Sequence, residues 1–230
     1  MSAAPGAAAG GEPLAVECAG ETLLLHCERA VYWPRRRTLL VADVHLGKEW
    51  AFGRAGLAVP AGATESDLCR LDRLVRRFDA GELLVLGDFT HAPPGDEDRW
   101  LDRVGDWLDT LPAEVSVVAG NHDRPATRHR LDRRIRWYAE CRLEPPFVLQ
   151  HEPEPDPRGY GLGGHLHPAL RMRGGGDSLR LPVFWFREEH AVLPAFGSFT
   201  GAQNVRPASG DRLYAVTPDA VIGVPVARRR

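Results

Sequence analysis

Short apolar segments alternate with amphipathic ones in the first half of the chain. Residues 39–42, 83–86 and 115–119 are short and mostly aliphatic, which predicts strands buried on both faces. Residues 64–78, with Thr64 or Ser66 as the helix cap, and residues 96–108 repeat large apolar side chains at helical spacing. This order of strand, helix, strand, helix and strand predicts a layered α/β fold.

The flanking segments are rich in predicted strands. Residues 14–18 and 22–27 form a predicted hairpin that continues into a strand at 30–33. Further strands are expected at residues 145–150, 161–164, 179–187, 191–193, 213–216 and 221–224, whereas residues 152–157 alternate acids with prolines and predict a loop. We expect a disordered tail at residues 1–13, followed by one domain over residues 14–227.

Composition narrows the class of protein. A chain of 230 residues with 43 % hydrophobic content can form one domain with a substantial core. Its net charge of −2 excludes a globally basic nucleic-acid-binding protein but is compatible with a local basic face. The four cysteines lack C-x-x-C spacing, and no apolar run approaches the roughly 18 residues of a membrane span. These features predict a cytoplasmic protein with reduced thiols and no contact with a membrane.

Polar motifs accompany the apolar runs. They are Asp43-Val44-His45, Gly87-Asp88, Gly120-Asn121-His122-Asp123, His151 and Gly164-His165-Leu166-His167. The first three follow predicted parallel strands, and ligands of open α/β sheets bind at the carboxyl ends of such strands. Aspartate, asparagine and histidine are the N/O ligands of transition-metal sites, and two metals about 3.5–4 Å apart can activate water against a phosphoryl group.

This ordered series resembles the calcineurin-like metallophosphoesterase superfamily from about residue 39 to residue 167. The resemblance implies a four-layer α-β-β-α sandwich with two mixed sheets flanked by helices. It also implies two divalent metal ions, one held by Asp43, His45 and His167, the other by Asn121, His151 and His165, with Asp88 bridging both. A carboxylate suits the bridging position because it has two oxygen atoms with lone pairs. Manganese is the first choice of metal, with iron, nickel or zinc as alternatives.

The same resemblance implies a reaction. A hydroxide that bridges the metals would attack phosphorus in line with the leaving oxygen. His122 would stabilise the transition state or protonate the leaving group, and Asp123 would orient His122. Nucleases and related diesterases of the superfamily often place a histidine three residues after the bridging aspartate, which assigns His91 to the site.

Two further stretches, residues 42–56 and 192–201, resemble a narrower family, the ligase-associated DNA-damage-response phosphoesterases or endonucleases. Ala202 stands where this family usually has a second glycine after Gly201. The resemblance implies a phosphodiester substrate, either DNA or RNA, and a functional association with a DNA ligase and a helicase. The competing hypotheses are a small-molecule phosphoesterase and a non-catalytic scaffold, although the scaffold relatives typically lose residues that are all present here.

Basic residues near the motifs are candidates for binding the substrate. They are Lys48, Arg54, Arg124 and Arg128. The arginine-rich segment 124–136 is interpreted either as a track for a nucleic-acid backbone, with Trp137 and Tyr138 stacking on bases, or as a helix with a solvated basic face. Phe184, Trp185 and Phe186 form either a homodimer contact or an ordinary strand with alternating burial.

Overall fold

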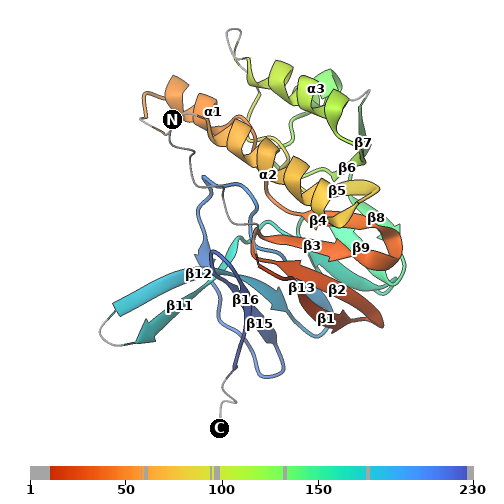
Figure 1. Ribbon diagram of the computed structural model, residues 1–230, viewed down its shortest axis with the longest axis vertical. Coiled ribbons are helices and arrows are strands. Elements are labelled where there is room, and N and C mark those ends of the chain that lie inside the picture. The colour runs from red at the N-terminus through yellow and green to blue at the C-terminus, as the bar shows by residue number, and fades with distance from the viewer. Residues whose placement is uncertain are drawn as a thin grey trace, which may run out of the picture.

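The computed structural model describes residues 11–57, 59, 62–93, 95, 99–131, 134–174 and 177–226 (Figure 1). Most of the predicted tail at residues 1–13 lies outside this described part, as do residues 227–230.

A seven-stranded mixed sheet contains the predicted parallel strands. Its strands, in spatial order, are β1 (Leu14–Cys18), β2 (Glu21–His26), β3 (Ala30–Trp33), β4 (Thr38–Val41), β5 (Glu82–Leu86), β6 (Glu114–Val118) and β7 (Ile135–Tyr138). Pairing is antiparallel from β1 to β4 and parallel from β4 to β7. All of β4 is buried, because other elements cover both faces of the sheet. The carboxyl ends of β4, β5 and β6 therefore lie side by side.

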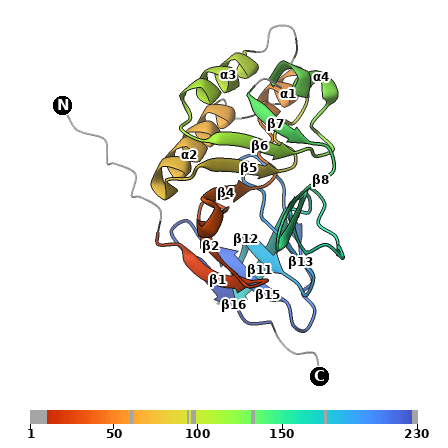
Figure 2. The same cartoon turned by 90° about the vertical axis from the view of Figure 1, so that its right-hand side faces the viewer.

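Four helices pack on one face of this sheet (Figure 2). They are α1 (Lys48–Arg54), α2 (Ala63–Phe78), α3 (Trp100–Thr110) and α4 (Pro125–Leu131), and a short 3-10 helix, η1 (Pro34–Arg36), precedes β4. Leu71 of α2, Trp100 of α3 and Leu131 of α4 join one hydrophobic cluster with the sheet, and Trp50 of α1 packs against it. The helical spacing of the apolar residues thus determines which face of each helix is buried.

The second sheet is built from the rest of the chain. Its strands are β8 (Cys141–Glu144), β9 (Phe147–Gln150), β10 (Tyr160–Gly163), β11 (Pro168–Gly174), β12 (Asp177–Phe186), β13 (His190–Val192), β14 (Gln203–Asn204), β15 (Arg212–Val216) and β16 (Val221–Val224). The spatial order is β14-β11-β12-β13-β10-β9-β8, and β15 pairs with β12 and β16. A second hydrophobic cluster, which includes Trp33, Phe147 and Phe184, joins the two sheets.

The predicted α/β sandwich of two mixed sheets is confirmed, with one difference in its layers. The described residues contain no helix after Leu131, so the helices form one outer layer rather than two. The far face of the second sheet carries a small cluster around Val183 and Leu213, against which Val205 and Val226 pack. No helix in the described part of the chain is both long and apolar enough to cross a membrane.

Two local predictions are wrong, and a third lies partly outside the described residues. Helix α2 begins at Ala63 after Gly62 and has no side-chain cap. Thr64 instead accepts a hydrogen bond from the amide of Gly47 and donates one to Glu49, because α1 packs beside α2. Segment 124–136 is not one helix, since α4 ends at Leu131 and parallel pairing with β6 recruits the following residues into β7. Helix α3 begins at Trp100, and residues 96–98 of its predicted start lie outside the described residues.

The proposed homodimer contact also disagrees with the structure. Phe184 and Phe186 are 0 % and 1 % exposed and belong to the cluster between the sheets. Trp185 lies on the other face of β12, where its indole N–H donates to Asp211 at 2.8 Å. These aromatic residues alternate within the fold, so they are not available as a dimer surface.

Candidate metal centre

Parallel strands of the first sheet deliver three of the predicted ligands. Asp43, Asp88 and Asn121 follow the carboxyl ends of β4, β5 and β6. The amide of Asp43 donates to the carbonyl of Gly87 at 3.1 Å, and the amide of His45 donates to that of Asp88 at 2.8 Å. These hydrogen bonds continue the strand pairing past the sheet edge and fix the first two motifs relative to each other.

The second sheet delivers the remaining ligands to the same place. His151 follows β9, and His165 and His167 lie between β10 and β11. The amide of His165 donates to Asp43 Oδ2 at 2.8 Å, which ties the last motif to the first. A bridge between Ala42 and Ala195 also joins the two sheets beside the site. The predicted convergence of distant motifs on one edge of the sandwich is therefore present.

The first predicted group of ligands is compact. His167 Nε2 lies 3.6 Å from Asp43 Oδ2 and 3.4 Å from His45 Nε2. His45 Nε2 is also 3.8 Å from Asp88 Oδ2. Asp43, His45 and His167 thus form a group whose ligand atoms are close enough together to surround one ion.

The second group is equally close. His151 Nε2 lies 3.0 Å from both Asn121 Oδ1 and His165 Nδ1, and 3.6 Å from Asp88 Oδ2. The same oxygen of Asp88 therefore faces a histidine of each group. This is the position expected for a bridging carboxylate.

The chemistry of these donors fits divalent cations. Asp43 is fully buried, burial raises the pKa of its carboxyl group, and its Oδ1 has no hydrogen-bond partner among the described residues. Burial lowers the pKa of His45 to about 2, so this imidazole is neutral and its lone pair can bind a metal. A bound cation would satisfy this buried carboxylate oxygen, which has no hydrogen bond among the described residues.

The backbone around the ligands is strained. Asp43, His45, Asp88, His165 and His167 all have positive φ, between 46° and 65°. Residues other than glycine rarely adopt such angles, and each costs of the order of 1–3 kcal/mol. The surrounding fold therefore holds five of the seven predicted ligands in conformations that an unconstrained chain avoids.

The motif glycines are explained by close contacts. A Cβ atom on Gly87 would lie 1.8 Å from Nδ1 of His151, one on Gly120 would lie 2.2 Å from Asp88 Oδ1, and one on Gly164 would lie 2.3 Å from Asp43 Oδ2. Only Gly87 has a positive φ, 84°. Gly87 therefore allows a sharp turn, whereas Gly120 and Gly164 are required because the side chains of Asp88 and Asp43 pass against their backbone.

His122 and His91 lie together beside the first group. Their rings are stacked with centroids 4.7 Å apart, and His91 Nδ1 is 3.4 Å from His45 Nδ1. The amide of His122 donates to Asp88 Oδ1 at 2.8 Å, and its Nδ1 is 2.9 Å from the carbonyl oxygen of His91. Because a carbonyl only accepts, this contact assigns the proton of a neutral His122 to Nδ1. Burial lowers the pKa of His91 to about 4.

The expectation that Asp123 orients His122 is wrong. The buried carboxylate of Asp123 accepts hydrogen bonds from the amides of Gly120 at 2.9 Å, Thr90 at 2.8 Å and Phe89 at 3.2 Å. Desolvation raises the pKa of this carboxyl group, and the backbone hydrogen bonds oppose that effect. Asp123 therefore joins the loops after β5 and β6, while the carbonyl of His91 orients His122.

Substitution of Asp123 with alanine is expected to destabilise the fold. The amides of Gly120, Thr90 and Phe89 would lose their acceptor, and the two donors with the shorter hydrogen bonds alone would cost about 1–3 kcal/mol each. The free energy of unfolding in urea should fall by roughly 2–6 kcal/mol. Asp102→Ala on the exposed side of α3 is the control and should change it by less than about 0.5 kcal/mol. Equal stability of the two variants would contradict the role given to Asp123.

Two of the four candidate substrate residues lie in or next to the site. Lys48 opens α1, is half-buried, and lines a small pocket with His45 and Phe199. Burial lowers the pKa of its ammonium group, and the charge of Asp88 opposes this effect. Arg124 is exposed directly after the Asp123 motif.

The other two candidates make contacts away from the ligands. Arg54 donates to the carbonyl of Pro93 at 3.1 Å. Arg128 lies over the ring of Trp137, 5.8 Å from its centroid, and Trp137 packs edge-on against Phe89. The ring of Trp137 is therefore packed between Phe89 and Arg128 and is not an open surface on which bases could stack.

An aromatic rim at the site escaped the sequence prediction. Phe199 is 39 % exposed and its ring centroid is 5.8 Å from that of Phe52, which lies 5.6 Å from His91. The sequence did contain a hint of this rim, since Phe52 and Phe199 belong to the two stretches that resemble the narrower family. Their proximity depends on the loop after β13 returning to α1, which no periodicity reveals.

Removal of divalent cations is expected to lower the melting temperature. Metal at 100 times its Kd adds about 2.7 kcal/mol of stability per site, and 1 kcal/mol moves the Tm of a domain of this size by about 2–4 °C. Two sites therefore predict a fall of roughly 10–20 °C when excess manganese is replaced by EDTA, as measured by calorimetry. An unchanged Tm would contradict metal binding at these residues.

Comparison with known proteins adds independent findings. The crystal structure of nuclease MPE from Pseudomonas putida aligns with a TM-score of 0.77 and 39 % sequence identity, and the alignment covers 92 % of this chain and 100 % of that one. YfcE, a phosphoesterase from E. coli, aligns with a TM-score of 0.45 and 16 % identity over 81 % of this chain and 97 % of its own.

A protein of unknown function from Aquifex aeolicus, AQ665, aligns with a TM-score of 0.42 and 21 % identity, covering 56 % of this chain and 78 % of its own. No curated protein matches the chain. Residues 36–197, which contain all seven predicted ligands, match the family described as calcineurin-like phosphoesterase. The chain therefore belongs to the calcineurin-like phosphoesterase family and is a metal-dependent phosphoesterase.

Proposed function

We propose that the protein hydrolyses phosphodiester bonds of nucleic acid at a centre of two divalent cations. The observation that carries this proposal is the position of Asp88, whose Oδ2 lies within 3.8 Å of a histidine nitrogen in each group of ligands. One carboxylate shared by two groups suits two ions. When bound, two cations would supply an activated water and neutralise charge on the phosphoryl oxygens.

The chain's own residues orient the substrate and move the proton. His122 uses Nδ1 to donate to the carbonyl of His91, so Nε2 is the ring atom left for the substrate. In the protonated imidazole, Nε2–H can donate to a phosphoryl oxygen and then transfer its proton to the leaving oxygen. The amide of His122 donates a hydrogen bond to Asp88 Oδ1, which fixes the position of this imidazole relative to the proposed ligands.

Two features support a nucleic-acid substrate. Phe52 and Phe199 border the ligands, and exposed aromatic rings beside a phosphate site can stack on bases. The ammonium group of Lys48 lies near Phe52, 5.7 Å from the ring centroid, and can contact a phosphate on the same rim. The 39 % identity with a nuclease over nearly the whole chain favours the same class of substrate.

The proposed metal is manganese, with iron, nickel or zinc as alternatives. The predicted ligands offer only nitrogen and oxygen, which suits hard and borderline ions. Location in the cytoplasm and association with a DNA ligase and a helicase stay predictions from the sequence.

A side-by-side assay tests the proposal. Protein stripped with EDTA and reloaded with manganese is given bis-p-nitrophenyl phosphate, p-nitrophenyl phosphate, and labelled single-stranded DNA and RNA. We expect activity to vanish on chelation and return with metal, with the diester preferred over the monoester and at least one oligonucleotide cleaved. Cleavage of the small diester alone would instead favour a small-molecule phosphoesterase.

A further inference from the structure

Three arginines lie in one row across neighbouring strands of the second sheet. Arg171 of β11 pairs directly with Arg180 of β12. On the other side, β14 pairs in parallel with β11, with Ala169 opposite Asn204, and the amide of Val205 donates to the carbonyl of Ala169 at 2.9 Å. Continued by two residues past Asn204, this parallel register would place Arg206 next to Arg171.

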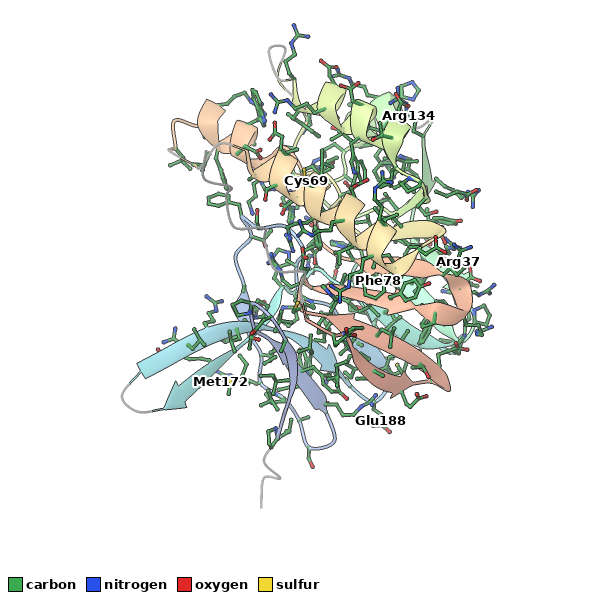
Figure 3. All side chains as sticks on the ribbon, in the orientation of Figure 1. Arg37, Cys69, Phe78, Arg134, Met172 and Glu188 are labelled. Atoms are coloured by element: carbon green, nitrogen blue, oxygen red, sulfur yellow. The ribbon has the colours of Figure 1, made fainter. Side chains whose placement is uncertain are left out.

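Two members of the row, Arg171 and Arg180, lie on one face of a protruding hairpin. Strands β11 and β12 extend beyond the body of the molecule, as Figure 1 shows, and Figure 3 labels Met172 on this hairpin. Because side chains alternate along a strand, Arg171 shares its face with Ala169, while Met172 and its partner Leu179 occupy the other. The arginine face is therefore separate from the apolar face.

These arginines are exposed, and the described residues provide no ion pair or hydrogen bond for their side chains. Many other surface arginines have a carboxylate partner, such as Arg76 with Asp72 and Arg136 with Glu114. Like charges directly opposite each other destabilise a pair of strands. An anion that bridges the guanidinium groups would remove this repulsion.

Only a few residues of the chain separate the row from the metal centre. Strand β11 begins directly after the ligand His167, whose carbonyl accepts from the amide of Gln203 at 2.9 Å. His167 Nδ1 also lies 3.1 Å from the carbonyl of Gly201. Arg171 follows His167 by four residues, a distance of about 13 Å along a strand, and adjacent strands are about 4.8 Å apart. At this distance the guanidinium groups of the row can contact phosphates of a strand that leaves the centre and crosses the hairpin.

We infer that Arg171, Arg180 and Arg206 form a secondary binding site for the phosphodiester backbone of a nucleic-acid strand whose scissile bond lies at the metal centre. This inference rests on the proposed function. The row would bind phosphates without reading bases, because guanidinium groups on the surface of a strand contact the sugar-phosphate backbone and not the edges of bases.

The test measures binding and chemistry separately. Binding of a fluorescent single-stranded oligonucleotide to the full chain in EDTA is followed by anisotropy between 50 and 200 mM salt. The variant carries Arg171→Ala, Arg180→Ala and Arg206→Ala together. One control variant removes three paired arginines elsewhere, Arg35, Arg76 and Arg136, and a second carries Met172→Ala and Leu179→Ala on the opposite face of the hairpin. Hydrolysis of bis-p-nitrophenyl phosphate with manganese reports on the metal centre.

We expect the triple variant to bind at least about tenfold more weakly and to reduce the slope of log K against log salt by about 2, since each lost single-strand phosphate contact contributes about 0.7. Both controls should bind like the wild type, and all variants should hydrolyse the small diester within about twofold of it. If the triple variant keeps the affinity and the salt dependence of the wild type, the proposed secondary binding site is contradicted, whereas the proposed function is not. Absence of oligonucleotide binding by the wild type, with the small diester still hydrolysed, would overturn the nucleic-acid proposal and the row together.

Discussion

Replacing Asp88 with asparagine should abolish both metal binding and phosphodiester hydrolysis. The amide keeps the shape of the side chain but loses the negative charge and one of the two acceptor oxygens, of which Oδ2 faces both groups of predicted ligands and Oδ1 accepts from the amide of His122. Loss of a residue that only supports a metal ligand costs 10–100-fold in affinity or activity, so loss of the shared ligand should exceed about 100-fold. Metal content by elemental analysis and turnover of bis-p-nitrophenyl phosphate measure the two effects.

The control for this substitution is Asp106→Asn, an exposed residue of α3. It changes net charge by the same amount and should leave metal content and turnover unchanged. Circular dichroism should show both variants folded, because asparagine is nearly isosteric with aspartate. Full metal content and activity in Asp88→Asn would remove the basis for a shared carboxylate.

Substitution of His122 with alanine should reduce turnover by about 10²–10⁴-fold, the range typical of a lost general acid. Metal content should stay near that of the wild type, because this imidazole is stacked on His91 and only its backbone amide contacts Asp88. The loss should be larger for an alkyl diester than for bis-p-nitrophenyl phosphate, since p-nitrophenolate leaves readily without a proton. Steady-state kinetics on the two esters measure this difference.

The same experiment separates the two roles considered for His122. An equal loss on both esters would assign it to stabilising charge on the phosphoryl oxygens and not to protonating the leaving group. Alanine at His91 is a useful comparison, because it retains the carbonyl that accepts from His122. Unchanged turnover in His122→Ala would exclude both roles.

The sequence predicted the parts of the centre that depend on local pattern. Short apolar runs ended where Asp43, Asp88 and Asn121 begin, and parallel strands must bring such ends together. The pairing of the second sheet then carried His151 and His167 to the same edge. The seven side chains were therefore predictable individually, although their roles as ligands stay a proposal.

The features that the sequence missed depend on contacts between distant segments. The strand β7 was not predicted, because arginines hide its pattern and only pairing with β6 determines its conformation; a helix over residues 124–136 was one of two interpretations of the segment that leads into it. Asp123 was expected to contact its neighbour His122, but the amides of Thr90 and Phe89 approach it from the loop after β5. Phe52 and Phe199 come from segments that meet only in the folded protein.

The positive φ values of five predicted ligands are another feature that no local pattern reveals. Asp43 and His167 adopt a conformation that is unfavourable in isolation, so tertiary packing must supply the compensating energy. Such strain is a common property of sites in which binding geometry is fixed before the ligand arrives. It is consistent with the stabilisation expected from metal.

Anomalous diffraction from crystals soaked in manganese examines the centre directly. We predict two peaks about 3.5–4 Å apart, with Asp88 bonded to both, Asp43, His45 and His167 around one, and Asn121, His151 and His165 around the other. A single peak, or peaks that these side chains do not contact, would contradict a two-metal phosphodiesterase centre.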